Sequence, residues 1–174
     1  WQGAHGGSCR LPKPAFPNVT IPTFQELLEE LRGMVGLNIQ VYQTDPPLLS
    51  EICRLYDAYD LYQEGYLTMS TYREADLVRE INPRIELCVL ERQRAMDVAS
   101  LRAQKAYGCR YVQPAASDVD SEFCQAAKDL GLCVNMCCSD TDEDNRRYIG
   151  YGVQGILTDC PDVLLKTIAD MGLH

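Results

Sequence analysis

Residues 121–137 read SEFCQAAKDLGLCVNMC and predict a helix, a glycine stop and a strand in direct succession. The helix is expected over residues 121–130. Gly131 is well placed just after its last turn, because glycine adopts the left-handed backbone conformation required there without strain. Residues 132–137 are short and mostly apolar, which is typical of a strand whose two faces are both covered.

The same order of elements recurs on both sides of this stretch. Strands are predicted at residues 37–42, 65–70, 85–90, 110–113, 132–137 and 155–158. Helices are predicted from Thr23, and at residues 48–62, 72–80, 94–106, 121–130, 142–150 and 161–171. Strands that alternate with helices imply right-handed crossovers and a parallel sheet. The predicted fold class is therefore α/β, a partial TIM (β/α) barrel, because six such units are too few to close an eight-unit barrel alone.

Composition limits the possible partners. The chain has 174 residues, a formal net charge of -9 and 46% hydrophobic residues. An acidic protein is not expected to bind nucleic acid or anionic membrane over a broad surface, and no segment has the length of a membrane span. Residues 1–18 predict a loop or remnant segment, and residues 19–174 predict a single domain.

Nine cysteines and two histidines bear on metal binding and compartment. No CxxC pair occurs, and His5 and His174 lie at opposite ends of the sequence, so a structural zinc site is not expected. The cysteine content and the glycosylation acceptor pattern Asn18-Val19-Thr20 favour an extracytoplasmic setting. Neither feature resolves the compartment or the disulfide pairing.

Five segments carry a more specific signal. In chain order they are IPTFQELL at 21–28, LNIQV at 37–41, INPRI at 81–85, AAKDLGLCV at 126–134 and GVQGILTDCPD at 152–162. Together they resemble segments of the glycerophosphodiester phosphodiesterase family. The resemblance covers residues 17–170, and it rests on the order and spacing of the segments rather than on any one of them.

This resemblance implies a TIM barrel with its active site at the carboxyl ends of the strands. The six predicted strands correspond to the third through eighth of such a barrel, and the first two have no counterpart in this sequence. Whether those two strands are naturally absent or belong to a longer chain is left open. We therefore expect either a further barrel segment or a homo-oligomeric partner.

The family resembled uses a divalent cation, carboxylates and histidines to hydrolyse a phosphodiester. In this chain Gln40 stands where the family has a metal-binding Glu, and Tyr42 stands where it has a Lys. Ala4-His5-Gly6-Gly7 echoes the family's first histidine motif without its Arg, so His5 is a candidate catalytic residue, with a Gly-rich loop as the alternative. No metal ligand is assigned. No cofactor is expected, with Mg²⁺ or Ca²⁺ expected only if the family activity is retained.

Further family positions are occupied by different side chains. Thr68 and Met69 stand where the family has a Ser pair, and Cys137 stands where it has a Trp. Cys137 is either a nucleophile or a plain replacement. Asp159 matches the closing motif and is either a carboxylate at the mouth of the barrel or, with Asp162, a cap for the last helix.

Two functional hypotheses follow. The first is a glycerophosphodiester phosphodiesterase-like protein, a phosphoric diester hydrolase of glycerophospholipid metabolism by descent, inactive as this chain. The alternative is a non-enzymatic binding or structural protein on a reduced barrel, which assembles with another chain. In either case a glycerophosphate-type ligand is the expected small molecule. The sequence leaves open whether the chain is an enzyme.

Overall fold

All the described α-helices except the last begin where a polar side chain caps the backbone. In the computed structural model, which describes residues 20–173, Thr23 and Glu26 form reciprocal hydrogen bonds at the start of α1 (Phe24–Leu31), and Thr71 and Glu74 do the same at α3 (Tyr72–Ile81). The chain divides into two units, residues 1–31 and 32–174, and each is described by itself. Within the first unit the described structure is α1 with its cap.

The second unit contains the six strands that the sequence predicts. They are β1 (Leu37–Gln40), β2 (Gly65–Met69), β3 (Leu87–Val89), β4 (Tyr111–Val112), β5 (Cys133–Cys137) and β6 (Gly155–Leu157). Its α-helices are α2 (Pro46–Tyr59), α3, α4 (Val98–Tyr107), α5 (Ser121–Asp129), α6 (Asp142–Tyr151) and α7 (Pro161–Asp170). The alternation of strands and helices is confirmed.

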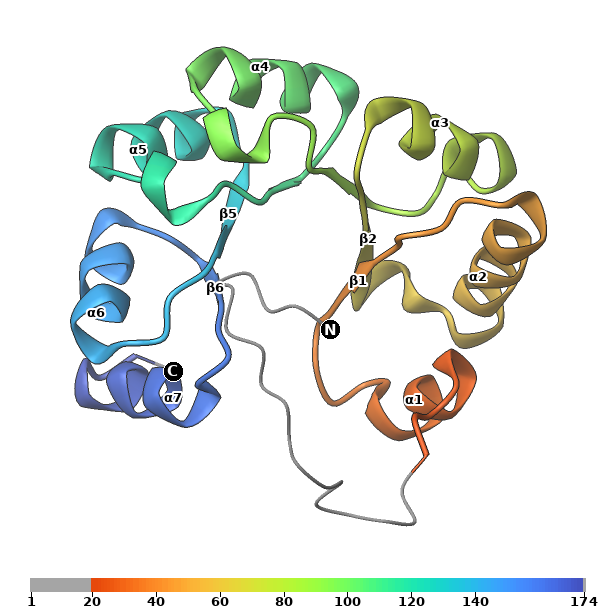
Figure 1. The fold of residues 1–174 in the computed structure, drawn as a ribbon, viewed down its shortest axis with the longest axis horizontal. Coiled ribbons are helices and arrows are strands. Elements are labelled where there is room, and N and C mark those ends of the chain that lie inside the picture. The colour runs from red at the N-terminus through yellow and green to blue at the C-terminus, as the bar shows by residue number, and fades with distance from the viewer. Residues whose placement is uncertain (1–19, 174) are drawn as a thin grey trace, which may run out of the picture. The chain divides into compact units, whose positions relative to one another are not determined.

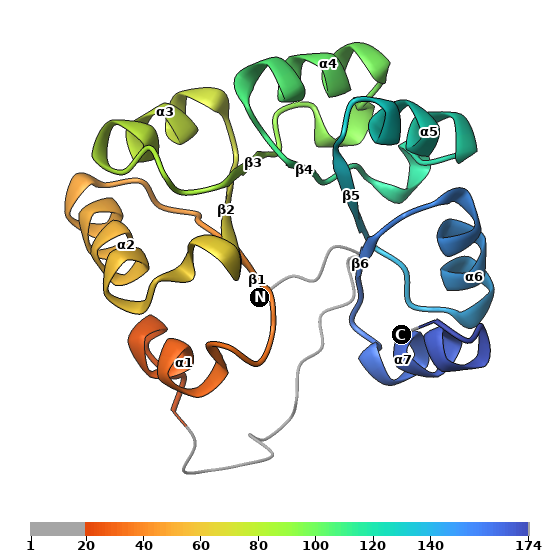
Figure 2. The same cartoon turned by 180° about the vertical axis from the view of Figure 1, so that it is seen from behind.

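All recorded strand pairs are parallel, and they form two three-stranded sheets, β1-β2-β3 and β4-β5-β6. Figure 1 shows α2 to α7 on the outer side of the strands, and Figure 2, from behind, shows β3 and β4 next to each other between β2 and β5. Within residues 20–173 no backbone ladder joins β3 to β4. The parallel α/β class is therefore confirmed, with the strands divided between two sheets.

A hydrophobic core lies between the strands and helices of residues 96–153, in the second unit. It is formed by buried residues that include Leu101, Val112, Phe123, Ala127, Val134, Met136 and Tyr148. None of the helices in the described part of the chain has the length and apolar character needed to span a bilayer.

The start of one helix differs from the predicted one for an identifiable reason. The helix expected at 94–106 starts later, at Val98, because the Asp97 carboxylate accepts a 2.8 Å hydrogen bond from the Ser100 backbone N–H and so caps α4. The last helix begins at Pro161, the predicted residue, and Asp162 lies in its first turn, but no side chain caps it by a hydrogen bond. The hypothesis that Asp159 caps α7 is therefore wrong.

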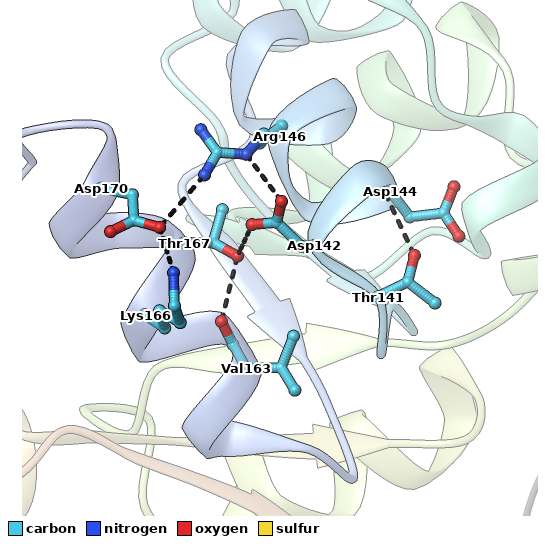
Figure 3. Close-up of polar contacts among 8 residues, drawn as sticks. All are labelled: Thr141, Asp142, Asp144, Arg146, Val163, Lys166, Thr167 and Asp170. Carbon is cyan, nitrogen blue, oxygen red and sulfur yellow. Dashed lines mark hydrogen bonds and ion pairs between the residues drawn. The ribbon is translucent and has the colours of Figure 1, made fainter.

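Polar contacts fix α6 against α7 (Figure 3). The Thr167 hydroxyl, which is completely buried, donates a 2.7 Å hydrogen bond to the Asp142 carboxylate. Arg146 contacts Asp142 at 2.9 Å and Asp170 at 3.5 Å, so one guanidinium joins the two helices. Because the three charged side chains are 40–53% exposed, their ion pairs orient the helices more than they stabilise them.

Candidate functional site

The carboxyl end of β1 presents the two substituted family positions. Gln40 is the last residue of β1, and Tyr42 lies just beyond it with 76% of its surface exposed. Val41 between them is buried, as the two-residue period of extended chain requires. Gln40 and Tyr42 are thus both exposed where the neighbouring strands also end.

A chain of hydrogen bonds runs beneath Gln40 and crosses from one sheet to the other. The Thr68 hydroxyl on β2 donates to Oδ1 of Asn38 at 2.6 Å, and Nδ2 of Asn38 donates to Oε1 of Gln113 at 3.0 Å. Thr68 is completely buried and Gln113 is 3% exposed. Thr68 is the register partner of Gln40, and its hydroxyl links β2 to Asn38 on β1 and is not presented to solvent.

Met69 follows Thr68 and is also completely buried. Because side chains alternate along a strand, Met69 points to the opposite side of β2 from Thr68. The two residues predicted as a pair are therefore separated onto different faces of the strand.

The carboxyl end of β5 carries a disulfide between neighbours, Cys137 and Cys138, which are joined by a cis peptide bond. Both residues are half-buried. The hypothesis that Cys137 is a nucleophile is wrong for this state, because a sulfur in a disulfide has no thiolate to offer. The sequence has nine cysteines, which allow many pairings, so this pairing was not predictable. Six other cysteines of the described residues are free.

The carboxyl end of β6 is fixed by Asp140, from the loop after β5. One of its carboxylate oxygens accepts two 2.8 Å hydrogen bonds, from the Thr158 hydroxyl and from the Asp159 backbone N–H. The Asp159 side chain is exposed. Asp159 is therefore held at the strand end through its backbone, by the carboxylate of Asp140.

The described side chains do not fit the divalent cation that the resemblance implies. Among residues 20–173, no three His, Cys, Asp or Glu side chains lie close enough together to hold a metal ion. At β1 the side chains are an amide and a phenol, whereas Mg²⁺ and Ca²⁺ prefer carboxylates. We therefore derive no reaction step through a metal. His5 and Asn18 lie outside the described residues.

A cavity of about 510 Å³ lies at the other end of the strands. Its lining comes from their amino ends and includes Asn38, Glu64, Gly65, Tyr66, Glu86, Arg110, Tyr111, Asn135, Gln154 and Gly155. The predicted site lies at the carboxyl ends, where barrel enzymes carry out their chemistry. The cavity and the predicted site are therefore at opposite ends of the same strands.

Side chains inside this cavity connect the two sheets a second time. The Tyr66 and Tyr111 rings stack with centroids 4.3 Å apart, and Nδ2 of Asn135 donates to the Tyr66 hydroxyl at 2.5 Å. Burial raises the pKa of Tyr66 to about 12, so it stays protonated at neutral pH. Gly155 leaves room for this contact, since a Cβ there would lie 2.8 Å from Oδ1 of Asn135.

No protein-family model matches the chain, and a search of the curated proteins finds no significant match.

Solved structures are similar in fold. A protein from Silicibacter pomeroyi assigned as a glycerophosphoryl diester phosphodiesterase is 23% identical, with a TM-score of 0.75 over 87% of this chain and 57% of that one. One from Galdieria sulphuraria assigned as a glycerophosphodiester phosphodiesterase is 15% identical, with a TM-score of 0.76 over 86% and 65%. An Oleispira antarctica phosphodiesterase, solved with the product sn-glycerol-3-phosphate, is 16% identical, with a TM-score of 0.62 over 77% and 55%.

The chain thus spans 55–65% of the length of these three neighbours. At identities of 15–23% the likeness concerns the fold. The resemblance inferred from the five sequence segments is confirmed at that level. Over 86–87% of its residues, the chain has a parallel α/β fold like part of the fold of these two proteins, consistent with a partial TIM barrel.

Proposed function

We propose that this chain is a glycerophosphodiester phosphodiesterase-like protein, descended from phosphoric diester hydrolases of glycerophospholipid metabolism, that does not hydrolyse phosphodiesters by itself. The observation that supports inactivity is the pair Gln40 and Tyr42 at the carboxyl end of β1. The resemblance leads us to expect a Glu and a Lys at these two positions.

The two replacements remove opposite charges from one strand end. A Gln amide can donate an oxygen to a cation but adds no negative charge, and hard divalent cations bind carboxylates far better. A Tyr phenol can donate one hydrogen bond to a phosphate but adds no positive charge to stabilise a pentavalent transition state. Both the cation and the phosphoryl group therefore lose their electrostatic partner on β1.

A glycerophosphate-type ligand remains the small molecule that we propose for this strand end. The likeness in fold to the Oleispira antarctica phosphodiesterase, which was solved with sn-glycerol-3-phosphate, supports this choice. Binding would rely on hydrogen bonds from neutral groups such as Gln40 and Tyr42. We expect a dissociation constant in the millimolar range, which corresponds to a binding free energy of roughly -4 kcal/mol.

The test is a hydrolysis assay with sn-glycero-3-phosphocholine in the presence of Mg²⁺ or Ca²⁺. We expect no release of choline above background from the chain as given. A double variant, Gln40→Glu with Tyr42→Lys, is compared with a control, Glu80→Ala, at an exposed position on α3. Metal-dependent turnover by the unaltered chain would refute the proposed inactivity. Tighter binding of glycerol 3-phosphate by the double variant alone would support the electrostatic explanation.

An alternative function is a non-enzymatic protein that assembles with a second copy. Within residues 20–173, β6 pairs with β5 alone, and an apolar groove of about 240 Å³ lies beside it. The groove is lined by Ile149, Val153, Gln154, Gly155, Ile156, Leu164, Ile168 and Leu173. A free strand edge beside apolar side chains favours pairing with another chain.

Sedimentation equilibrium separates this alternative from a monomer. The variant Leu165→Asp adds a charge to α7 at a residue that is 67% exposed, so the fold is expected to tolerate it. A dimer that dissociates in this variant and persists in Glu80→Ala would support assembly through α7. A monomer at millimolar concentration would rule out the homo-oligomer.

A further inference from the structure

The Cys137–Cys138 disulfide joins adjacent residues, and this decides what it can do for stability. A disulfide stabilises a fold mainly by closing a loop in the unfolded chain, and the effect grows with loop length. A bridge between neighbours closes the shortest possible loop. It therefore constrains the unfolded chain very little, and a purely stabilising role does not explain it.

Hydrogen bonds hold the surrounding segment independently of the sulfur–sulfur bond. The Cys137 backbone N–H donates to the Pro114 carbonyl after β4 at 3.0 Å, and the Ser139 N–H donates to the Leu157 carbonyl of β6 at 3.1 Å. The Ser139 hydroxyl donates to Oδ1 of Asn145 at 2.7 Å, and both side chains are buried. Residues 137–139 thus have backbone partners on both sides, and because none of these hydrogen bonds involves a sulfur atom, we expect them to remain when the disulfide opens.

The other described cysteines are poorly suited to attack this bond. Four free cysteines are buried: Cys53, Cys88, Cys109 and Cys124. Cys160 is half-buried, and burial together with the carboxylates of Asp140, Asp162 and Asp159 raises its pKa. A thiol with a raised pKa supplies little thiolate, which is the attacking species. Cys133 is also half-buried, but it lies four residues before Cys137 on β5, about 13 Å away at about 3.3 Å per residue of extended strand. Among the described cysteines none is therefore well placed to open the bond, and we expect exchange to use an external thiol.

We propose that Cys137–Cys138 is a site of reversible thiol–disulfide exchange with small dithiols, located at the carboxyl end of β5. Both cysteines are half-buried at the end of the strand and are not enclosed in the core, so we expect a small molecule to reach the bond while the fold stays intact. This proposal is independent of the proposed function. Under this proposal, Cys137, which stands where the family resembled has a Trp, takes part in redox chemistry.

The exchange balances in two steps. A thiolate of the dithiol attacks one sulfur, the Cys137–Cys138 bond breaks, and a mixed disulfide forms with one cysteine while the other leaves as a thiolate and takes up a proton. The second thiol of the reagent then attacks the mixed disulfide. The chain gains two electrons and two protons, and the dithiol ends as a cyclic disulfide. A small oxidised disulfide such as oxidised glutathione reverses the change.

Differential labelling of the native chain tests the proposal. Free thiols are first blocked with N-ethylmaleimide, the chain is treated with dithiothreitol, and newly formed thiols are labelled with iodoacetamide. Tryptic cleavage releases residues 129–146, which contain Cys133, Cys137 and Cys138. We expect one maleimide and two iodoacetamide labels on this peptide, and recovery of the disulfide with oxidised glutathione.

Two variants and one further measurement make the outcome decisive. Cys138→Ser should lose both iodoacetamide labels, and Cys160→Ser should keep them. Maleimide on Cys137 or Cys138 before reduction, or resistance to dithiothreitol until the chain is unfolded, would overturn the proposal. Reduction of the native chain should lower Tm by less than about 4 °C, because the closed loop is so short. A much larger fall would identify a structural staple instead.

Discussion

Nδ2 of Asn38 on β1 donates a 3.0 Å hydrogen bond to Oε1 of Gln113, 75 residues further along the chain, just after β4. This contact joins the two three-stranded sheets through side chains, where no backbone ladder joins β3 to β4 among the described residues. Oδ1 of Asn38 also accepts a hydrogen bond from the Thr68 hydroxyl, so one amide pairs with polar groups from both halves of the second unit.

Asn38→Ala should therefore lower the free energy of unfolding by about 1–3 kcal/mol, since it leaves the buried Thr68 hydroxyl and the buried Gln113 carbonyl without this partner. Urea denaturation followed by circular dichroism measures the change. Glu80→Ala, at an exposed position on α3, is the matched control and should stay within about 0.5 kcal/mol of the original chain. Equal stability of the two variants would show that the amide does not couple the sheets.

Gly155→Ala tests the second connection between the sheets. The added Cβ would lie 2.8 Å from Oδ1 of Asn135 and must displace the side chain that hydrogen-bonds to Tyr66. We expect a loss of about 1–3 kcal/mol in the free energy of unfolding. In an Asn135→Ala background the same substitution should have a much smaller effect, because the clashing amide is gone. Additive losses in this double-mutant cycle would contradict the explanation.

The pH dependence of stability should reveal the contacts between α6 and α7. Hydrogen bonds from Arg146 and Thr167 lower the pKa of Asp142, so its charged form favours the folded state. This contribution is present above the unfolded pKa of about 3.9 and is lost as pH falls through the lower folded value. Asp142→Asn should thus be less stable than the original chain at pH 7 and equal to it near pH 2. Glu80→Gln should show no such convergence.

Cys109 should react slowly in the folded chain. Burial, with a contribution from Glu86, raises the pKa of its thiol to about 11, so only about 0.1% is thiolate at pH 8. Labelling of Cys109 by iodoacetamide should accelerate about tenfold per pH unit between pH 8 and 10. A rate that levels off above pH 9 would mean that labelling proceeds through the unfolded chain, whose thiols have a pKa of about 8.5.

The local pattern of the sequence predicted most of the fold. Alternating apolar runs and capped helices located all six strands of the described residues, because both signals are contained within about ten consecutive residues. Strand ends were less predictable. β4 spans Tyr111–Val112 rather than residues 110–113, since its parallel ladder with β5 includes only these two positions.

The candidate site was predictable in its positions but not in its contacts. The two-residue period placed Gln40 and Tyr42 at one strand end, yet the partners of Asn38 and Asp140 depend on how distant strands meet. The sequence separation of Asn38 and Gln113 is 75 residues, and no local signal encodes it. The Cys137–Cys138 bond was likewise one of many pairings that nine cysteines allow.

The division of the strands into two sheets has a consequence for motion. Amide hydrogens inside each ladder exchange only when that ladder opens, whereas no ladder crosses the boundary between β3 and β4 in the described residues, where one backbone hydrogen bond, from Ala115 to Gln93, joins the segments that follow these strands. We expect the two halves of the second unit to behave as separate cooperative units in hydrogen exchange, with β2 and β5 as their most protected strands. The second unit would then bend between β3 and β4, and the strand ends of one sheet would move relative to those of the other.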